Sequence, residues 1–220
     1  MNVTRRPRDM MIDCSFRLLP GAVPLEHGYS LLSALSRIMP SLHGDIQIGV
    51  HPIRGRRTGA NVLTLDGDSR LRIRAPVDRV GELLALAGRF LDVGGHEIGL
   101  GVPELWALAP ATTLYSRLVT IKGFTEPGPF LEAARRQMDA MGVSGRLEVP
   151  TVPEGPRAGL PRRRVVRVRQ MSVVGFAIVV EGLSDADSLT LQERGLGGRR
   201  RMGCGIFVPV RNDGGTGDES

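Results

Sequence analysis

The sequence predicts an α+β protein with two similar halves, each with the element order βαββαβ. Strand-like and helix-like hydrophobic patterns follow one another in this order twice, over two stretches of matching length. The composition, 41% hydrophobic and 24% charged, is ordinary for packed domains. Because tandem ferredoxin-like domains have this element order, we expect one at residues 10–110 and another at 111–211, with a disordered polar tail at 212–220.

In the first half, residues 11–19 alternate as a strand, and a helix is expected at 27–39, where Pro40 stops it. Further strands are predicted at 46–53, 62–65 and 71–73, with a Gly/Arg-rich loop at 55–59 and a turn at Asp66-Gly67. A strongly apolar helix at 77–87 and an extended segment at 96–108, broken at Pro103, complete the first half.

In the second half, strands are expected at 113–121, 146–149 and 205–210, and paired strands at 164–171 and 173–180. The helices are predicted at 129–141 and from the cap Ser184 to about 194, with Asp185 and Asp187 near the positive end of the second. No residue-by-residue repeat relates the halves, so the duplication concerns the order of elements.

The chain is basic, with a net charge of +6 and a pI near 10.5. Lys122 is the one lysine among 29 basic residues, and the rest are arginine. The guanidinium group binds phosphate through two parallel hydrogen bonds, although a coding bias could also produce this ratio. The positive charge itself favours a polyanionic partner.

Two cysteines, Cys14 and Cys204, are too few for a disulfide framework and do not form a CxxC pair, so no zinc site is expected. No apolar run is long enough to span a bilayer. We therefore expect a cytoplasmic protein with no membrane partner. We also expect a monomer or a homodimer.

The acidic residues do not cluster as a two-metal nuclease would require, and turn preference explains Asp66 and Asp68. We expect no metal and no cofactor. An aromatic share of 4% argues against a surface of stacked rings for single strands. Phe124 and Phe207 are interpreted as core or local stacking residues, and Trp106 as a core residue.

The most specific feature is the segment GLGGRRRMGCG at residues 195–205, between a predicted helix and the last strand. It holds five glycines and the consecutive arginines Arg199, Arg200 and Arg201. Glycines such as Gly197, Gly198 and Gly203 could let backbone N–H groups approach a phosphate while the arginines neutralise its charge. A tight solvated connection is the alternative. The segment matches neither a P-loop nor a dinucleotide fingerprint.

In the form GΦGxxxxxGΦG, this segment resembles the C-terminal glycine-rich loop of the RAMP superfamily of CRISPR systems. The stretches LEHGYSLLSALSR, PSLHGDIQIGVHPIRG, LYSRLVTIKGF and FLEAARRQ, with the loop itself, resemble the sixth family of CRISPR-associated proteins in its Myxan-subtype form. The resemblance covers roughly residues 11–211. It implies a metal-independent endoribonuclease that cleaves the repeat of precursor CRISPR RNA and often keeps the product bound.

Metal-free RNA cleavage needs a base for the ribose 2′-OH, an acid for the leaving 5′ oxygen and cations for the phosphate. Histidine suits the base or acid near neutral pH. His43, which follows the first helix, resembles the catalytic histidine of the commoner members of the family, and His27 resembles that of another branch. We rank His43 first and His27 second, and His51 or a mechanism without histidine remains open. A capping or packing role is the alternative for both His43 and His27.

Tyr29 and Ser36 are candidates for assisting proton transfer. The candidates for binding RNA are basic residues in four groups, with a solvated charged surface as the alternative. These are Arg37 and Lys122 near the phosphate, together with the loop arginines; Arg135 and Arg136 on a helix; Arg164, Arg167 and Arg169 on a basic strand; and Arg54, Arg56 and Arg57 in a loop.

We predict a tandem ferredoxin-like endoribonuclease that cuts repeat RNA at the base of a hairpin, leaving a 2′,3′-cyclic phosphate and a 5′-OH. The predicted partner is CRISPR repeat RNA, and other Cas proteins of a surveillance complex are possible partners. Two alternatives stay open. One is a non-catalytic subunit that binds the guide RNA in that complex, and the other is a regulatory protein that binds a nucleotide at the glycine-rich loop.

Overall fold

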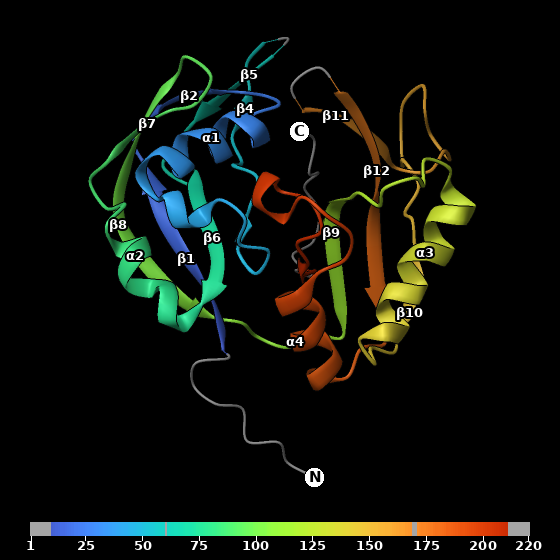
Figure 1. The fold of residues 1–220 in the computed structure, drawn as a ribbon. Coiled ribbons are helices and arrows are strands. Elements are labelled where there is room, and N and C mark those ends of the chain that lie inside the picture. The colour runs from blue at the N-terminus through green and yellow to red at the C-terminus, as the bar shows by residue number, and fades with distance from the viewer. Residues whose placement is uncertain (1–9, 60, 169–170, 211–220) are drawn as a thin grey trace. The chain divides into compact units, whose positions relative to one another are not determined.

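The computed structural model describes residues 10–59, 61–168 and 171–210, which form two compact units (Figure 1). The first unit extends to Leu108, and the second begins at Ala109. Each unit has a hydrophobic core of its own. The expected tail at 212–220 lies outside the described residues.

The first unit is built on an antiparallel sheet of five strands in the order β3-β6-β1-β8-β7. These strands are β1 (Met11–Leu18), β3 (Gly49–Val50), β6 (Arg70–Pro76), β7 (Phe90–Asp92) and β8 (Glu97–Ala107). The helices α1 (Gly28–Ile38) and α2 (Val80–Leu84) contribute Leu31, Leu35 and Leu83 to the same core as Cys14 and Phe16 of β1, so they cover one face of the sheet. A smaller sheet has the order β2-β5-β4, from β2 (Gly21–Pro24), β4 (Arg56–Arg57) and β5 (Val62–Leu65).

Several elements of the first unit differ from the sequence prediction. The strand expected at 46–53 is shorter, with β3 followed by one further hydrogen bond from the His51 N–H to the Arg72 carbonyl oxygen of β6. Before β3, the Asp45 carboxylate accepts the Gln47 N–H and turns the chain. The strands on either side of Asp66-Gly67 join different sheets, so this turn does not close a hairpin. The helix expected at 77–87 is a 3-10 turn, η3 (Val77–Arg79), followed by the single short helix α2.

The β8 strand also differs from its prediction, since it continues through Pro103, which lies opposite Phe16 of β1. Trp106 was expected in the core and is 57% exposed. Its partner in the β1–β8 register is Asp13, which alternates with the core residues Ile12 and Cys14. Because directly paired residues share a face of the sheet, Trp106 lies on the face opposite the core.

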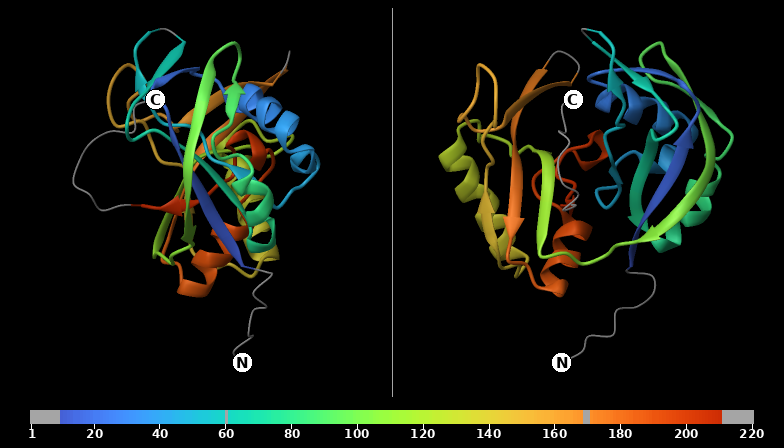
Figure 2. Two further views of the ribbon diagram at one scale, coloured as in Figure 1. Left: turned by 90° about the vertical axis from the view of Figure 1, so that its left-hand side faces the viewer. Right: turned by 180° about the vertical axis from the view of Figure 1, so that it is seen from behind.

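The second unit has a sheet in the order β10-β12-β9-β13, with β11 also paired to β12 (Figure 2). Its strands are β9 (Thr113–Val119), β10 (Arg146–Glu148), β11 (Arg163–Val168), β12 (Met171–Glu181) and β13 (Val208–Pro209). The helices are α3 (Pro127–Ala140) and α4 (Asp185–Arg194), and the Ser184 side chain accepts the Asp187 N–H at the start of α4, as predicted. Phe207 is fully buried, and Phe124 packs against the core while partly exposed.

Both units therefore have the ferredoxin-like strand order, in which the first and third strands of βαββαβ lie in the centre. In the first unit the central strands are β1 and β6, and in the second they are β9 and β12. The predicted fold class is confirmed. The order of elements could be predicted because each helix and strand has a hydrophobic pattern of its own period.

Candidate nucleic-acid interface and catalytic histidines

His27 is buried just before α1 and is held by backbone groups on both sides of its ring. Its Nδ1 lies 2.9 Å from the Pro24 carbonyl oxygen, and its Nε2 accepts the Ile53 N–H at 2.9 Å. This pattern requires a neutral ring with the proton on Nδ1. The side chain connects the end of β2, the start of α1 and the segment after β3. The geometry favours this structural role over the catalytic role considered for His27.

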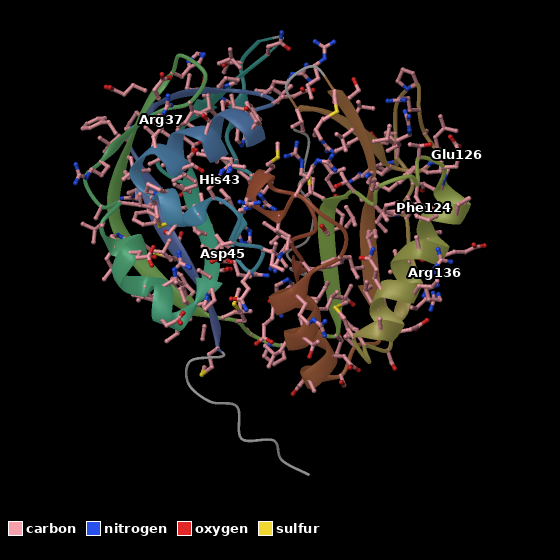
Figure 3. All side chains as sticks on the ribbon, viewed as in Figure 1. Arg37, His43, Asp45, Phe124, Glu126 and Arg136 are labelled. Carbon is pink, nitrogen blue, oxygen red and sulfur yellow. The ribbon has the colours of Figure 1, made fainter. Side chains whose placement is uncertain are left out.

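His43 lies on the exposed segment after α1 and the 3-10 turn η2 (Pro40–Leu42), and Figure 3 labels it there. Its N–H donates to the Pro40 carbonyl oxygen at 2.9 Å, so its backbone is fixed by the turn. Leu42 and Ile48 are fully buried on either side of it. Within the described chain its imidazole makes no hydrogen bond, which leaves the ring accessible to a substrate.

The other two histidines have different surroundings. His51 is buried, and its Nε2 lies 3.5 Å from Asp13 Oδ1. Asp13 also accepts two hydrogen bonds from Arg74, at 2.8 and 2.9 Å. Burial outweighs the attraction of Asp13 and lowers the pKa of His51 to about 4. Burial alone would raise the pKa of Asp13, but His51 and Arg74 hold it well below its usual range. His96 is half-buried in the turn between β7 and β8.

Three candidate residues lie on one side of α1. Ser36 and Arg37 follow Tyr29 by seven and eight residues, which places them on the side away from Leu31 and Leu35. Tyr29 is 36% exposed, and Arg37 donates to the Asp92 carbonyl oxygen at 3.0 Å. The helix thus brings a phenol and a guanidinium to one surface of the first unit, whereas the Ser36 hydroxyl oxygen is buried.

The glycine-rich loop is closed by backbone packing in the second unit. A Cβ at Gly195 or Gly205 would lie 2.1 Å from a backbone oxygen across the loop, and one at Gly197 would lie 2.3 Å from the Thr120 oxygen. Each of these glycines also has a positive φ. The close approach therefore requires glycine for the fold of the loop itself.

The N–H groups of all five loop glycines are bonded inside the unit, which differs from the expected phosphate cradle. Gly198 donates to the Thr120 carbonyl oxygen, Gly197 to the Gln137 side chain, Gly203 to Arg200 and Gly205 to Leu118. The negative charge of a ligand would therefore meet arginine side chains rather than these donors. Gly197 and Gly198 remain exposed, so a nucleic-acid backbone can approach them without meeting a side chain.

The three loop arginines lie in different environments. Arg199 has a φ of 63°, a left-handed conformation that non-glycine residues rarely adopt, and its carbonyl oxygen accepts the Met202 N–H at 2.8 Å. Arg200 is only 9% exposed and packs over Gly195, whereas Arg201 is half-buried. Consecutive arginines thus do not form one uniform charged surface, and Arg200 contributes to the packing of the loop.

The loop also joins two other basic segments of the second unit. Gln137 of α3 accepts the Gly197 N–H at 2.7 Å, and Thr120, two residues before Lys122, bonds to Gly198. One residue before Gln137, the Arg136 guanidinium lies 5.9 Å from the centre of the Phe124 ring (Figure 3). Lys122, Arg136 and the exposed glycines therefore belong to one connected region. Sequence reasoning missed Gln137 and Thr120, because single polar residues carry no periodic signal.

The remaining basic candidates are distributed over other surfaces. Arg135 is exposed on α3. On β11, Arg167 is exposed together with Arg163 and Val165, while Arg164 points to the opposite face and is half-buried. Arg169 lies outside the described residues, so the expected pairing of Arg167 with Arg169 on one face stays a prediction. In the first unit, the expected Gly/Arg-rich loop contains the strand β4, whose Arg56 and Arg57 pair with β5.

In the part of the chain that the structure describes, no group of three or more His, Cys, Asp or Glu side chains is placed to share a metal ion. In the same residues, every helix is too short or too polar to cross a bilayer.

The strand order repeated in both units defines the class of tandem ferredoxin-like proteins, and comparisons with known proteins narrow this class to one family. The model of the Cas6 CRISPR family matches residues 12–212. The CRISPR-associated endonuclease Cas6 of Myxococcus xanthus is 42% identical over 200 residues, which cover 91% of this chain and 82% of that protein. The chain therefore belongs to the Cas6 family of CRISPR-associated proteins, as the resemblance of several stretches of the chain, together with the glycine-rich loop, predicted.

Solved structures show the same fold at low sequence identity. A CRISPR-associated Cas6 protein aligns with a TM-score of 0.63 at 13% identity, over 92% of this chain and 99% of the other. A Cas6-related protein from Pyrococcus furiosus has a TM-score of 0.63 at 14% identity, over 92% and 100%. A RAMP protein that binds different RNA substrates has a TM-score of 0.65 at 15% identity, over 91% and 100%.

Proposed function

We propose that the protein is an endoribonuclease that cleaves CRISPR repeat RNA in a precursor transcript and thereby releases guide RNAs. The observation that carries the proposal is the exposed imidazole of His43, on an anchored segment of a chain 42% identical to a CRISPR-associated endonuclease. An accessible histidine is the residue type that suits metal-independent RNA cleavage near pH 7.

In the proposed reaction, His43 takes the proton from a ribose 2′-OH. The 2′ oxygen forms a bond to the adjacent phosphorus, the bond from phosphorus to the 5′ oxygen breaks, and the leaving 5′ oxygen gains a proton. The products are a 2′,3′-cyclic phosphate and a 5′-OH. Of the two candidates for assisting proton transfer, the exposed Tyr29 fits this role better than Ser36, whose hydroxyl oxygen is buried.

The proposed RNA contacts come from basic residues that are exposed or half-buried in their own units. In the second unit they centre on the region formed by the glycine-rich loop, Lys122 and Arg136. Backbone contacts of this kind suit A-form RNA, whose base edges are poorly accessible in the deep groove. The full set is Arg37, Lys122, Arg135, Arg136, Arg164, Arg167, Arg199 and Arg201, together with the exposed glycines Gly197 and Gly198.

Purified protein incubated with repeat RNA in EDTA tests the chemistry, beside the same RNA with one 2′-deoxy substitution at the cut. The proposal expects cleavage of the first RNA in EDTA and none of the second, because the deoxy sugar lacks the nucleophile. Cleavage of the deoxy RNA, or loss of activity in EDTA, would contradict it. Binding without cleavage of any repeat RNA would favour the non-catalytic guide-binding subunit instead.

The H43A variant tests the base, and H96A is the matched control because His96 lies in a turn of the same unit. General base catalysis is worth about 10² to 10⁴ in rate, so H43A should lose about that factor in single-turnover cleavage. Its affinity for the RNA should stay near that of wild type. H96A should cut at the wild-type rate.

A further inference from the structure

The segment that carries His43 is attached to the following part of the first unit at two points, one on each side of the histidine. Before it, the Ser41 hydroxyl donates to Glu82 Oε2 on α2. After it, Asp45 Oδ2 accepts a hydrogen bond from Arg79 Nη1 at 2.7 Å. Arg79 and Glu82 are themselves joined, at 2.9 Å between Nε and Oε1. These four residues form a closed network, which we call the clamp.

The clamp is partly shielded from solvent, which strengthens it relative to an ordinary surface ion pair. The side chains of Arg79 and Asp45 are 21% and 16% exposed, while that of Glu82 is 46% exposed. Burial opposes the charge on Arg79, but its bonds to Glu82 and Asp45 raise its pKa. The hydrogen bonds from Ser41 and Arg79 lower the pKa of Glu82, so both groups stay charged over the working pH range.

Between the two points of attachment, His43 and Gly44 are exposed, and a side chain at Gly44 would meet nothing within 4 Å. Asp45 accepts the Gln47 N–H at 2.9 Å with its second carboxylate oxygen, so one side chain both forms the turn and reaches Arg79. An exposed residue with fixed backbone on both sides is what a proton-transfer group requires, since small displacements of a reacting group cost large factors in rate.

We infer that Arg79 is a positioning residue for His43: through the clamp it holds the exposed imidazole in the orientation that cleavage needs. The inference rests on the proposed function, in which His43 is the base. Arg79 touches neither the RNA nor the reacting atoms in this scheme. Its loss should therefore lower the rate of the chemical step and leave the binding of the RNA unchanged.

The test is single-turnover cleavage of repeat RNA at saturating protein by R79M, with the affinity for the 2′-deoxy RNA measured in parallel. R79M keeps an unbranched apolar stem and removes the charged guanidinium. We expect the rate to fall by about 10-fold to 100-fold and the Kd to change by less than 2-fold. R79K, which keeps the charge, should recover part of the rate. The matched control is R89M, because Arg89 is an exposed arginine of the same unit outside the clamp, and it should cut like wild type.

A double-mutant comparison separates positioning from a general structural effect. If Arg79 acts through His43, R79M added to H43A should cause no further loss. An equal loss in both backgrounds, a full rate for R79M, or a loss explained by weaker RNA binding would overturn the inference. Should R79M not fold, D45N removes the same contact from the other side and must reproduce the loss of rate.

The outcomes also distinguish the inference from the proposed function. An inactive H43A beside a fully active R79M would overturn the clamp alone. An H43A variant that cuts as fast as wild type would overturn the assignment of the base, and the role of the clamp with it.

Discussion

At the scale of single residues, two histidines sixteen positions apart differ entirely in what surrounds their rings. His27 has both nitrogens bonded to backbone groups in a buried site, while His43 is exposed. The residue type is the same, and the environment determines which ring can exchange a proton with a substrate.

Removing His27 should therefore destabilise the protein more than removing His43. H27A leaves the Ile53 N–H and the Pro24 carbonyl without the ring in a buried site, which costs about 1–3 kcal/mol. H43A lies at an exposed position and should change stability by about 0.5 kcal/mol or less. Urea unfolding of both variants measures the difference. If H27A were as stable as wild type but inactive in cleavage, the catalytic role of His27 would be restored.

At the scale of elements, the glycine-rich loop shows that neighbouring glycines have different functions. Gly197 has a φ of 70°, and a Cβ there would collide with the Thr120 oxygen, whereas Gly198 faces open space. The first glycine is needed for the loop to close, and the second leaves a surface accessible.

Alanine at these two positions should separate the two functions. G197A forces a left-handed conformation, worth about 1–2 kcal/mol, and also meets the Thr120 oxygen, so both melting temperature and RNA affinity should fall. G198A has room for the methyl group and should keep the wild-type melting temperature. Differential scanning fluorimetry and filter binding give the two readouts. Equal melting temperatures for the two variants would show that the loop does not depend on this close contact.

Helices and strands whose apolar residues repeat at regular spacing could be predicted from the sequence. The pairing of strands with one another could not. The helix expected at 27–39 is α1, and the strand expected at 62–65 is β5, because their apolar residues repeat at the spacing of one face. The pairing of β5 with β2 rather than β6 depends on contacts between segments far apart in the chain. For the same reason the clamp at Arg79 could not be predicted.

At the scale of the whole molecule, each unit has its own core and its own ionic interactions. Residues at the start of the second unit belong to it, since Gln192 of α4 donates to the Ala109 carbonyl oxygen at 2.8 Å and Ser188 accepts the Ala111 N–H at 2.9 Å. A division directly before Ala109 therefore keeps these bonds intact.

We predict that residues 109–220 alone fold and bind repeat RNA more weakly than the full chain, without cutting it. The glycine-rich loop and its neighbours belong to this unit, whereas His43 does not. A cooperative melting curve and a binding titration measure the two properties. Cleavage by this fragment would place the catalytic group in the second unit and contradict the role of His43.

The first unit should lose stability in mild acid because of His51. The unfolded ring binds a proton below its ordinary pKa of 6.5, whereas the folded ring does so only near pH 4. The neutral His51 ring therefore makes its full contribution to the free energy of unfolding above pH 6.5. This contribution is lost as the pH falls toward 4, by at most about 1.4 kcal/mol per pH unit. Asp13 adds a further loss only below its ordinary pKa of 3.8, because its folded pKa is lowered.

Urea unfolding at pH 7, 6, 5 and 4 measures this dependence for wild type and for H51N. Asparagine is polar but does not titrate, so the slope between pH 6.5 and 4 should be smaller in the variant. Hydrogen exchange should show the loss of protection in β1, β3 and β6, which carry the buried ionic residues or lead into them. Identical slopes for the two proteins would contradict the prediction.

By itself, the sequence determined the order of the elements, the fold class, the family resemblance and the residues worth testing, because hydrophobic period and local motifs are properties of short stretches of chain. The tertiary structure alone decided which histidine is buried, which glycines close the loop and which face of the sheet carries Trp106. Those properties depend on contacts between residues distant in sequence, such as Ile53 with His27, Thr120 with Gly198 and Asp13 opposite Trp106. Burial and hydrogen bonding then set the chemistry of side chains that look equivalent in the linear chain.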